Sequence, residues 1–204
     1  MRPPPRLTER FLAATDLAVE IHGDRRRLGT EVPYMAHLLI VTGLVLEDGG
    51  DEDDAIAALL HDAVEDGGGR PVLERIEGQF GHEVAEVVAA LTDNLDDDEE
   101  PPWRERKERY LEHLSEVTDE RVLRVALADK VHNARSIVRD YREEGDPLWE
   151  RFENRTADDQ LWYYGELLRF FAERRPGPLV EDLERATDEL AVLVRRTRDP
   201  NGHH

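Results

Sequence analysis

Hydrophobic residues recur three or four positions apart along most of the chain, which is the period of an amphipathic helix. Between residues 8 and 21 the pattern is carried by Phe11, Leu17 and Ile21, and Thr8 can cap the first turn. There is no convincing strand pattern and no internal repeat. The sequence therefore predicts an all-α helical bundle, with helices over residues 8–21, 34–46, 51–66, 71–79, 83–92, 103–114, 121–142, 149–174 and 179–196.

Glycine and proline clusters mark the boundaries between these predicted elements. The run Gly67-Gly68-Gly69 is expected to end the third helix, and a Pro/Gly segment over residues 175–178 indicates a linker. Residues 93–100 form an acidic loop. We expect a main domain over residues 1–174, followed by a C-terminal helix and tail over residues 175–204.

Composition narrows the class of protein. The chain has 204 residues, of which 39% are hydrophobic and 36% are charged, and it contains no cysteine. Disulfides, thiolate metal sites and cysteine nucleophiles are therefore excluded. The N-terminal residues carry no signal-peptide pattern, and no apolar run approaches the roughly 20 residues that a membrane span requires. We expect a cytoplasmic protein with no membrane partner.

The net charge of −20 limits the partners further. A chain this acidic is repelled by nucleic acid, and no basic face is evident, so we expect no nucleic-acid partner. A small anionic ligand remains compatible with this charge if basic side chains gather locally, as in Arg25-Arg26-Arg27. The sequence leaves open whether the chain forms a homo-oligomer.

The stretch over residues 57–66 is the strongest candidate for chemistry. It begins apolar and then places four ionisable residues, His61, Asp62, Glu65 and Asp66, within six positions. On a single helix, side chains four apart share a face, so His61 would lie beside Glu65, and Asp62 beside Asp66. An imidazole with nearby carboxylates indicates a divalent-metal site with acid/base capacity.

Two further residues fit the same site. His37 lies on the second predicted helix and Asp129 on the long one, so three helices could converge on one metal. Taken alone, His37 could be a polar residue whose hydrogen bonds are satisfied by its neighbours. Asp129 could be part of a solvated charge pattern. Together with His61 and Asp62 they form a long and specific pattern. Asn133 lies four residues after Asp129 and shares its helix face.

The set His37, His61-Asp62 and Asp129 resembles the signature of the HD-domain metal-dependent phosphohydrolases. More narrowly, the chain resembles the hydrolase half of the RelA/SpoT alarmone enzymes and their stand-alone small alarmone hydrolases over roughly residues 8–164. The supporting segments include Pro33-Tyr34-x-x-His37, the run over residues 58–66, and the run from Leu127 to Arg135. No synthetase domain is expected after this region.

The resemblance implies a role for each candidate residue. His37, His61, Asp62 and Asp129 would bind one Mn²⁺, and Glu65 and Asp66 would act on the nucleophilic water. The basic loop, represented by Arg26 and Arg27, would contact the nucleotide, as would Asn133. On charge alone, Lys107 is a further candidate for neutralising phosphates.

The chain departs from the family pattern in places that bear on the substrate. Gly67-Gly68-Gly69 replaces a threonine-rich turn, Glu31-Val32 precedes Pro33-Tyr34 where Gly-Thr is usual, and the loop over residues 93–100 is acidic where basic residues are common. We expect a pyrophosphohydrolase that removes the 3′-diphosphate from guanosine alarmones. The alternatives are an HD-family phosphatase acting on another nucleotide, such as a nucleoside monophosphate or NADPH, and a nucleotide-binding protein without turnover.

Overall fold

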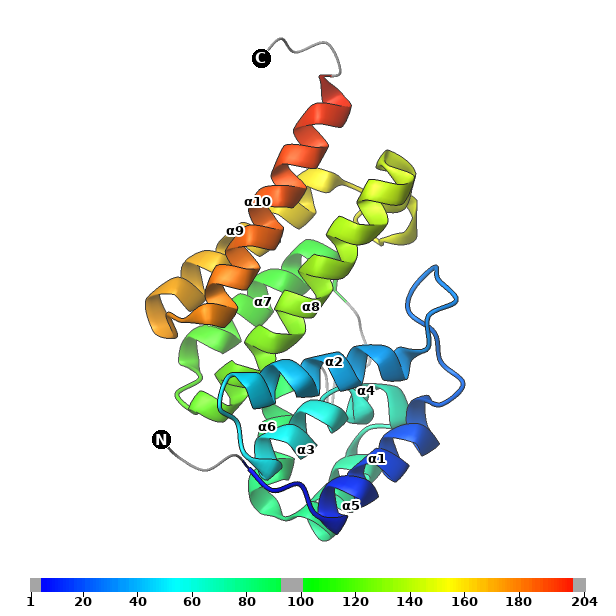
Figure 1. Ribbon diagram of the computed structural model, residues 1–204, viewed down its shortest axis with the longest axis vertical. Coiled ribbons are helices and arrows are strands. Elements are labelled where there is room, and N and C mark those ends of the chain that lie inside the picture. The colour runs from blue at the N-terminus through cyan, green and yellow to red at the C-terminus, as the bar shows by residue number, and fades with distance from the viewer. Residues whose placement is uncertain (1–4, 93–100, 200–204) are drawn as a thin grey trace. The chain divides into compact units, whose positions relative to one another are not determined.

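A computed structural model describes residues 5–92 and 101–199. The described residues are mainly helical and contain no strand, which confirms the all-α class (Figure 1). The predicted acidic loop over residues 93–100 lies outside the described residues. No helix in the described part is long and apolar enough to span a bilayer. The chain forms two compact units, Met1–Glu99 with Val117–Asp129, and Glu100–Glu116 with Lys130–His204.

The first unit holds α1 to α6 and the beginning of α8. The bounds of these helices are α1 Glu9–His22, α2 Tyr34–Glu47, α3 Glu52–Leu60, α4 Ala63–Gly67, α5 Arg70–Phe80, α6 His82–Leu91 and α8 Glu120–Glu144. The central element is α3, which packs against α1, α2 and α6. Its last six residues, from Ala55 to Leu60, are completely buried, because three alanines among them let the neighbouring helices approach closely.

The second unit contains the rest of α8 together with α7 Trp103–Glu116, the 3₁₀ helix η1 Asp146–Arg151, α9 Ala157–Arg174 and α10 Pro178–Arg198. Its core includes Leu114, Leu148, Leu167, Phe171 and Leu183, all nearly or fully inaccessible to solvent. Helix α9 packs against α7 and α10. Trp149, Tyr163 and Tyr164 are also buried, so aromatic side chains contribute to packing within this unit.

Two predicted helices are interrupted in the structure. The helix expected over residues 149–174 is instead η1 and α9, because Arg155 adopts a left-handed backbone conformation and the Thr156 side chain accepts a hydrogen bond from the Asp159 N–H, capping a new helix. The helix expected over residues 51–66 is broken at His61-Asp62, where the backbone of Asp62 leaves helical geometry. The second break creates the site.

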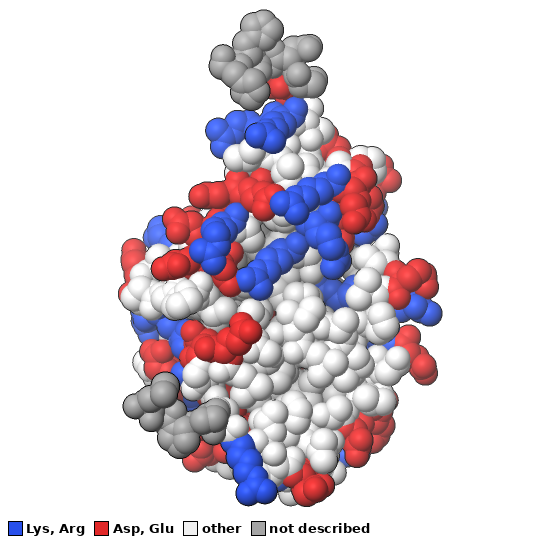
Figure 2. All heavy atoms as spheres, in the orientation of Figure 1, with Lys and Arg blue, Asp and Glu red and all other residues white. Residues whose placement is uncertain are grey.

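Charge is unevenly distributed over the surface of the first unit. Helix α2 is apolar around most of its circumference, and two of its outward residues, Leu39 and Ile40, are 51% and 44% exposed. Figure 2 shows a broad area without charged side chains on the side of this unit that faces the viewer.

Candidate metal centre

The break between α3 and α4 directs two neighbouring side chains into the site. His61 follows the last residue of α3, and Asp62 precedes the first residue of α4 with φ −95° and ψ 0°. A continuous helix would have separated the two side chains by about 100° of rotation. Instead, Nε2 of His61 and Oδ2 of Asp62 lie 3.0 Å apart. The expectation that these residues lie on one unbroken helix is therefore wrong.

The orientation of His61 is fixed by the backbone of α3. Its Nδ1 lies 2.8 Å from the carbonyl oxygen of Ala58, one turn earlier. Because a carbonyl can only accept, Nδ1 carries the hydrogen and donates it. Nε2 is thereby directed into the site as the ligand atom, an arrangement typical of metal-binding histidines.

His37 and Asp129 come from α2 and α8 to the same point. Nε2 of His37 lies 3.4 Å from Nε2 of His61 and 3.3 Å from Oδ1 of Asp129. Oδ1 of Asp129 is 3.8 Å from Nε2 of His61. One ligand atom from each of these three buried residues lies within 4.8 Å of the other two. Three helices thus converge as the sequence predicted.

Asp62 adds a second carboxylate to this group. Its Oδ2 is 3.6 Å from Nε2 of His37 and accepts a hydrogen bond of 2.5 Å from the hydroxyl of Tyr34. Tyr34 is the first residue of α2, three positions before His37. The same helix therefore supplies one candidate ligand and the group that orients another.

The spacing of these atoms fits a divalent cation. With bonds of about 2.1 Å to nitrogen and oxygen, adjacent ligands lie roughly 3.0 Å apart in an octahedron and roughly 3.4 Å apart in a tetrahedron. The distances between His61 and Asp62, between the two imidazoles, and between His37 and Asp129 are 3.0, 3.4 and 3.3 Å. Two imidazoles with two carboxylates suit a borderline or hard metal and leave coordination positions for water and phosphate.

The electrostatics of the site also favour a cation. Burial lowers the pKa of His37. Burial opposes protonation of His61 too, but the carboxylates of Asp62 and Asp129 outweigh it and raise the pKa of that imidazole well above its usual value. Burial likewise opposes ionisation of Asp62, yet the imidazoles of His61 and His37 hold the pKa of its carboxyl well below the usual range. A cation bound here has to displace the proton on Nε2 of His61, while Nδ1 keeps the hydrogen that it donates to Ala58.

We therefore expect metal affinity to fall as the pH is lowered. Because the pKa of His61 is raised, protons compete with the metal at a higher pH than they would for an ordinary histidine. Calorimetric titration with Mn²⁺ at about pH 8 and about pH 6 should show weaker binding at the lower value, and proton release in buffers of different ionisation enthalpy. Equal affinity at both values, without proton release, would contradict this description of the site.

The carboxylates of α4 differ in their surroundings. Asp66 forms an ion pair with Arg25, and its Oδ2 lies 3.4 Å from Nδ1 of His22, which is completely buried. Glu65 is exposed. Asp66 is thus held by His22 and Arg25, at the end of α1 and just after it. Their catalytic roles stay predictions.

The basic loop between α1 and α2 is ordered by its own backbone. The N–H of Arg27 donates to the carbonyl of Val32 at 2.8 Å, and the N–H of Tyr34 donates to the carbonyl of Arg25 at 2.9 Å. Arg26 pairs with the Glu31 side chain at 3.1 Å, and the Arg27 guanidinium lies 5.9 Å from the centre of the Tyr34 ring. This contact places Arg27 beside the tyrosine that orients Asp62. Arg25, in contrast, is already paired with Asp66.

Two predicted substrate contacts belong to the other unit. Asn133 lies on α8, four residues after Asp129, in the part of the helix assigned to that unit. Lys107 lies on α7, where its ammonium is 5.5 Å from the centre of the Tyr163 ring. Their contact with the nucleotide stays a prediction.

Two aromatic residues beside the candidate ligands, Tyr34 and His22, had no predicted role. The rings of His22 and Tyr34 stack with centroids 5.2 Å apart, and the ring centroids of Tyr34 and His37 are 5.4 Å apart. The only sequence signal for Tyr34 was its position beside Pro33, three residues before His37. His22 is the last residue of α1, and no motif in the sequence marks it. The residues around the candidate ligands are thus harder to identify from spacing than the ligands themselves.

Comparisons with known proteins identify related sequences. The profile of the HD domain family matches residues 14–157. A Xenopus tropicalis protein, named guanosine-3′,5′-bis(diphosphate) 3′-pyrophosphohydrolase MESH1, is 39% identical over 132 residues, which cover 63% of this chain and 70% of that protein. The Escherichia coli protein named bifunctional (p)ppGpp synthase/hydrolase SpoT is 33% identical over 137 residues, which cover 65% of this chain but only 18% of the larger protein.

The fold is also found among solved structures. The structure of a metazoan orthologue of SpoT, described as hydrolysing ppGpp, matches with a TM-score of 0.64 and 24% sequence identity. The match covers 90% of this chain and 97% of that one. At this level of identity the likeness concerns the fold.

Proposed function

Because the chain belongs to the HD domain family, we propose that it is a metal-dependent pyrophosphohydrolase that removes the 3′-diphosphate from guanosine alarmones, (p)ppGpp. The observation that carries the proposal is the convergence of His37, His61, Asp62 and Asp129 from three helices, with distances that suit a divalent cation. The name of the Xenopus relative, which shares 39% identity, supports the choice of substrate.

We propose Mn²⁺ as the bound metal, one per chain. The donor set of two imidazoles and two carboxylates is compatible with it and with other divalent cations. When bound, the metal would lower the pKa of a coordinated water and offset charge that develops on phosphorus. His37, His61, Asp62 and Asp129 would hold it, and the Tyr34 hydroxyl would keep Asp62 oriented.

The carboxylates of α4 would handle the proton of the attacking water. Water would add to the phosphorus attached to O3′ and lose a proton, and the bond between that phosphorus and O3′ would break. The leaving O3′ would take up a proton from solvent, which balances the proton lost by the water. The products would be pyrophosphate and the guanosine nucleotide that keeps its 5′-phosphates. The exposed Glu65 would accept the proton of the water, and Asp66, held by Arg25, would hold that water in line.

A highly anionic substrate needs local positive charge in a protein with a net charge of −20. Arg26 and Arg27 lie on the loop that leads into α2, and Arg27 is close to Tyr34. We propose that both contact the nucleotide, and that Lys107 and Asn133 do so as well.

The nucleotide substrate and the absence of cysteine favour a cytoplasmic location.

Replacing Arg26 and Arg27 together with alanine should raise KM more than it lowers kcat, since both side chains would act through charge attraction to phosphates. The effect should be larger at low ionic strength, where this attraction is least screened. Metal content should not change. Steady-state kinetics at two salt concentrations would check this, with Arg75→Ala as the control because Arg75 pairs with Glu20 on an exposed surface. A double variant with parental KM would show that the loop has been misassigned.

A panel of nucleotides tests the proposed substrate. The manganese-loaded protein should have its highest kcat/KM for guanosine 3′,5′-bis(diphosphate) and little activity on nucleoside monophosphates or NADPH. Preference for a monophosphate, with release of orthophosphate only, would replace the proposal by a nucleotide phosphatase. Binding of the alarmone without turnover at any metal concentration would indicate a nucleotide-binding protein.

A further inference from the structure

One arginine on α8 contacts both of the other helices that carry candidate ligands. Nη1 of Arg124 donates to Oδ2 of Asp54 at 2.6 Å, and its Nε lies 3.3 Å from Oδ2 of Asp48. Asp48 is the C-cap of α2 and Asp54 lies in the first turn of α3. All three residues belong to the first unit.

These contacts occur at a distance from the metal centre. Along their helices, Asp48 follows His37 by 11 residues, Asp54 precedes His61 by seven, and Arg124 precedes Asp129 by five. At 1.5 Å per residue these intervals are roughly 16, 10 and 8 Å. Arg124 therefore contacts α2 and α3 at one position along the helix axes. The candidate ligands meet at another position, roughly 8 to 16 Å further along these helices.

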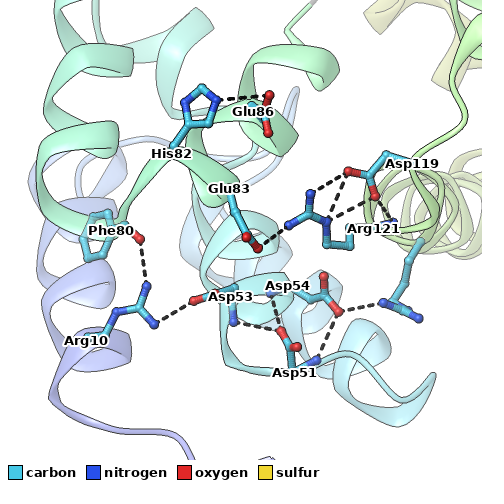
Figure 3. Close-up of polar contacts among 11 residues, drawn as sticks. Arg10, Asp51, Asp53, Asp54, Phe80, His82, Glu83, Glu86, Asp119 and Arg121 are labelled. Atoms are coloured by element: carbon cyan, nitrogen blue, oxygen red, sulfur yellow. Dashed lines mark hydrogen bonds and ion pairs between the residues drawn. The ribbon is translucent and has the colours of Figure 1, made fainter.

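The Arg124 contacts are well shielded from solvent. The side chains of Asp54, Asp48 and Arg124 are 4%, 11% and 18% exposed. Burial raises the pKa of Asp54, and this effect is opposed by the backbone N–H of Asp51, which donates to its Oδ2 at 3.1 Å, and by Arg124. Figure 3 shows Asp54 at the centre of the polar contacts around the start of α3. A buried ion pair contributes little net stability, but it can specify one register of packing.

We propose that Arg124 is a positioning residue for the metal centre, and that it fixes the axial register of α8 against α2 and α3. A shift of α8 by a fraction of a turn would move Asp129 away from His37 and His61. The proposal rests on the metal site proposed above. It concerns metal affinity, independently of the identity of the substrate.

The structure provides a matched control three residues earlier on the same helix. Arg121 pairs with Asp119 and, at 2.9 Å, with Glu83 of α6 (Figure 3). Helix α6 carries none of the candidate ligands. Arg121 also attracts the Asp54 carboxylate electrostatically, but its hydrogen bonds go to Glu83 and Asp119. Removing Arg121 should therefore cost some stability without removing a direct contact between the three helices that carry the candidate ligands.

The test is a Mn²⁺ titration of folded protein by calorimetry, well below the unfolding temperature of each variant. Arg124→Met should weaken binding by about 10-fold, the lower end of the range found for residues that hydrogen-bond to ligands directly, because Arg124 acts on the ligands through helix position. Arg121→Met should stay within about twofold of the parent, and Arg124→Lys should recover part of the loss because it restores the charge.

A second variant covers the case in which Arg124→Met does not fold. The triple variant Asp48→Asn, Asp54→Asn, Arg124→Met removes the whole charge group and leaves no buried charge unpaired, so it should fold and still bind Mn²⁺ weakly. Parental affinity in either Arg124→Met or the triple variant, or an equal loss in Arg121→Met, would overturn the positioning role. If the parent itself bound no metal, the proposed metal site would fail instead.

Discussion

Asp62→Ala is expected to abolish stoichiometric metal binding and, with it, turnover. The change removes one anionic ligand and the acceptor of the Tyr34 hydroxyl, and it withdraws the carboxylate nearest to Nε2 of His61. Loss of a residue that only orients a ligand costs about 10- to 100-fold in metal affinity, so loss of a ligand should cost more than about 100-fold. Elemental analysis of protein purified with excess Mn²⁺ would measure the effect.

Asp16→Ala is a suitable comparison for this variant, because Asp16 is exposed on α1 and its loss changes the net charge by the same amount. It should keep parental metal content. If Asp62→Ala retained about one metal per chain, the assignment of Asp62 as a ligand would be wrong.

The second large effect is expected for Glu65→Gln. The amide keeps the shape of the side chain but cannot accept a proton, so kcat should fall by roughly two to four orders of magnitude, the typical contribution of a general base. Metal content should remain parental, because Glu65 is exposed on α4 while the candidate ligands are buried or partly buried. Single-turnover measurements would separate the chemical step from product release.

Glu74→Gln, at an exposed position of α5, controls for the loss of one carboxylate in the first unit. Asp66→Asn should also lower kcat, because it weakens the contact with Arg25. Near-parental turnover in both Glu65→Gln and Asp66→Asn would show that neither carboxylate takes part in the chemistry.

Most helices could be predicted from the sequence because their ends are encoded locally. Thr8 caps α1 through its side chain, Pro33 precedes α2, and Asp51 caps α3 in a capping box with Asp54. The break at His61-Asp62 was missed. No glycine or proline marks it, and it is stabilised by contacts between helices that are distant in sequence.

The candidate site shows the same division between local and distant information. The ligand types and their order along the chain indicated His37, His61, Asp62 and Asp129, because adjacent His-Asp at the end of an apolar helix is an unusual local pattern. The Tyr34 hydroxyl on Asp62 and the contacts of Arg124 with Asp48 and Asp54 depend on tertiary packing. Periodicity alone could not reveal them.

Product analysis of the manganese-loaded protein with guanosine 3′,5′-bis(diphosphate) tests the central proposal most directly. Phosphorus NMR of the reaction should show pyrophosphate and guanosine 5′-diphosphate formed in equal amounts, and no reaction with the Asp62→Ala variant. Orthophosphate as the released species, or turnover that persists in the Asp62→Ala variant, would contradict the proposal.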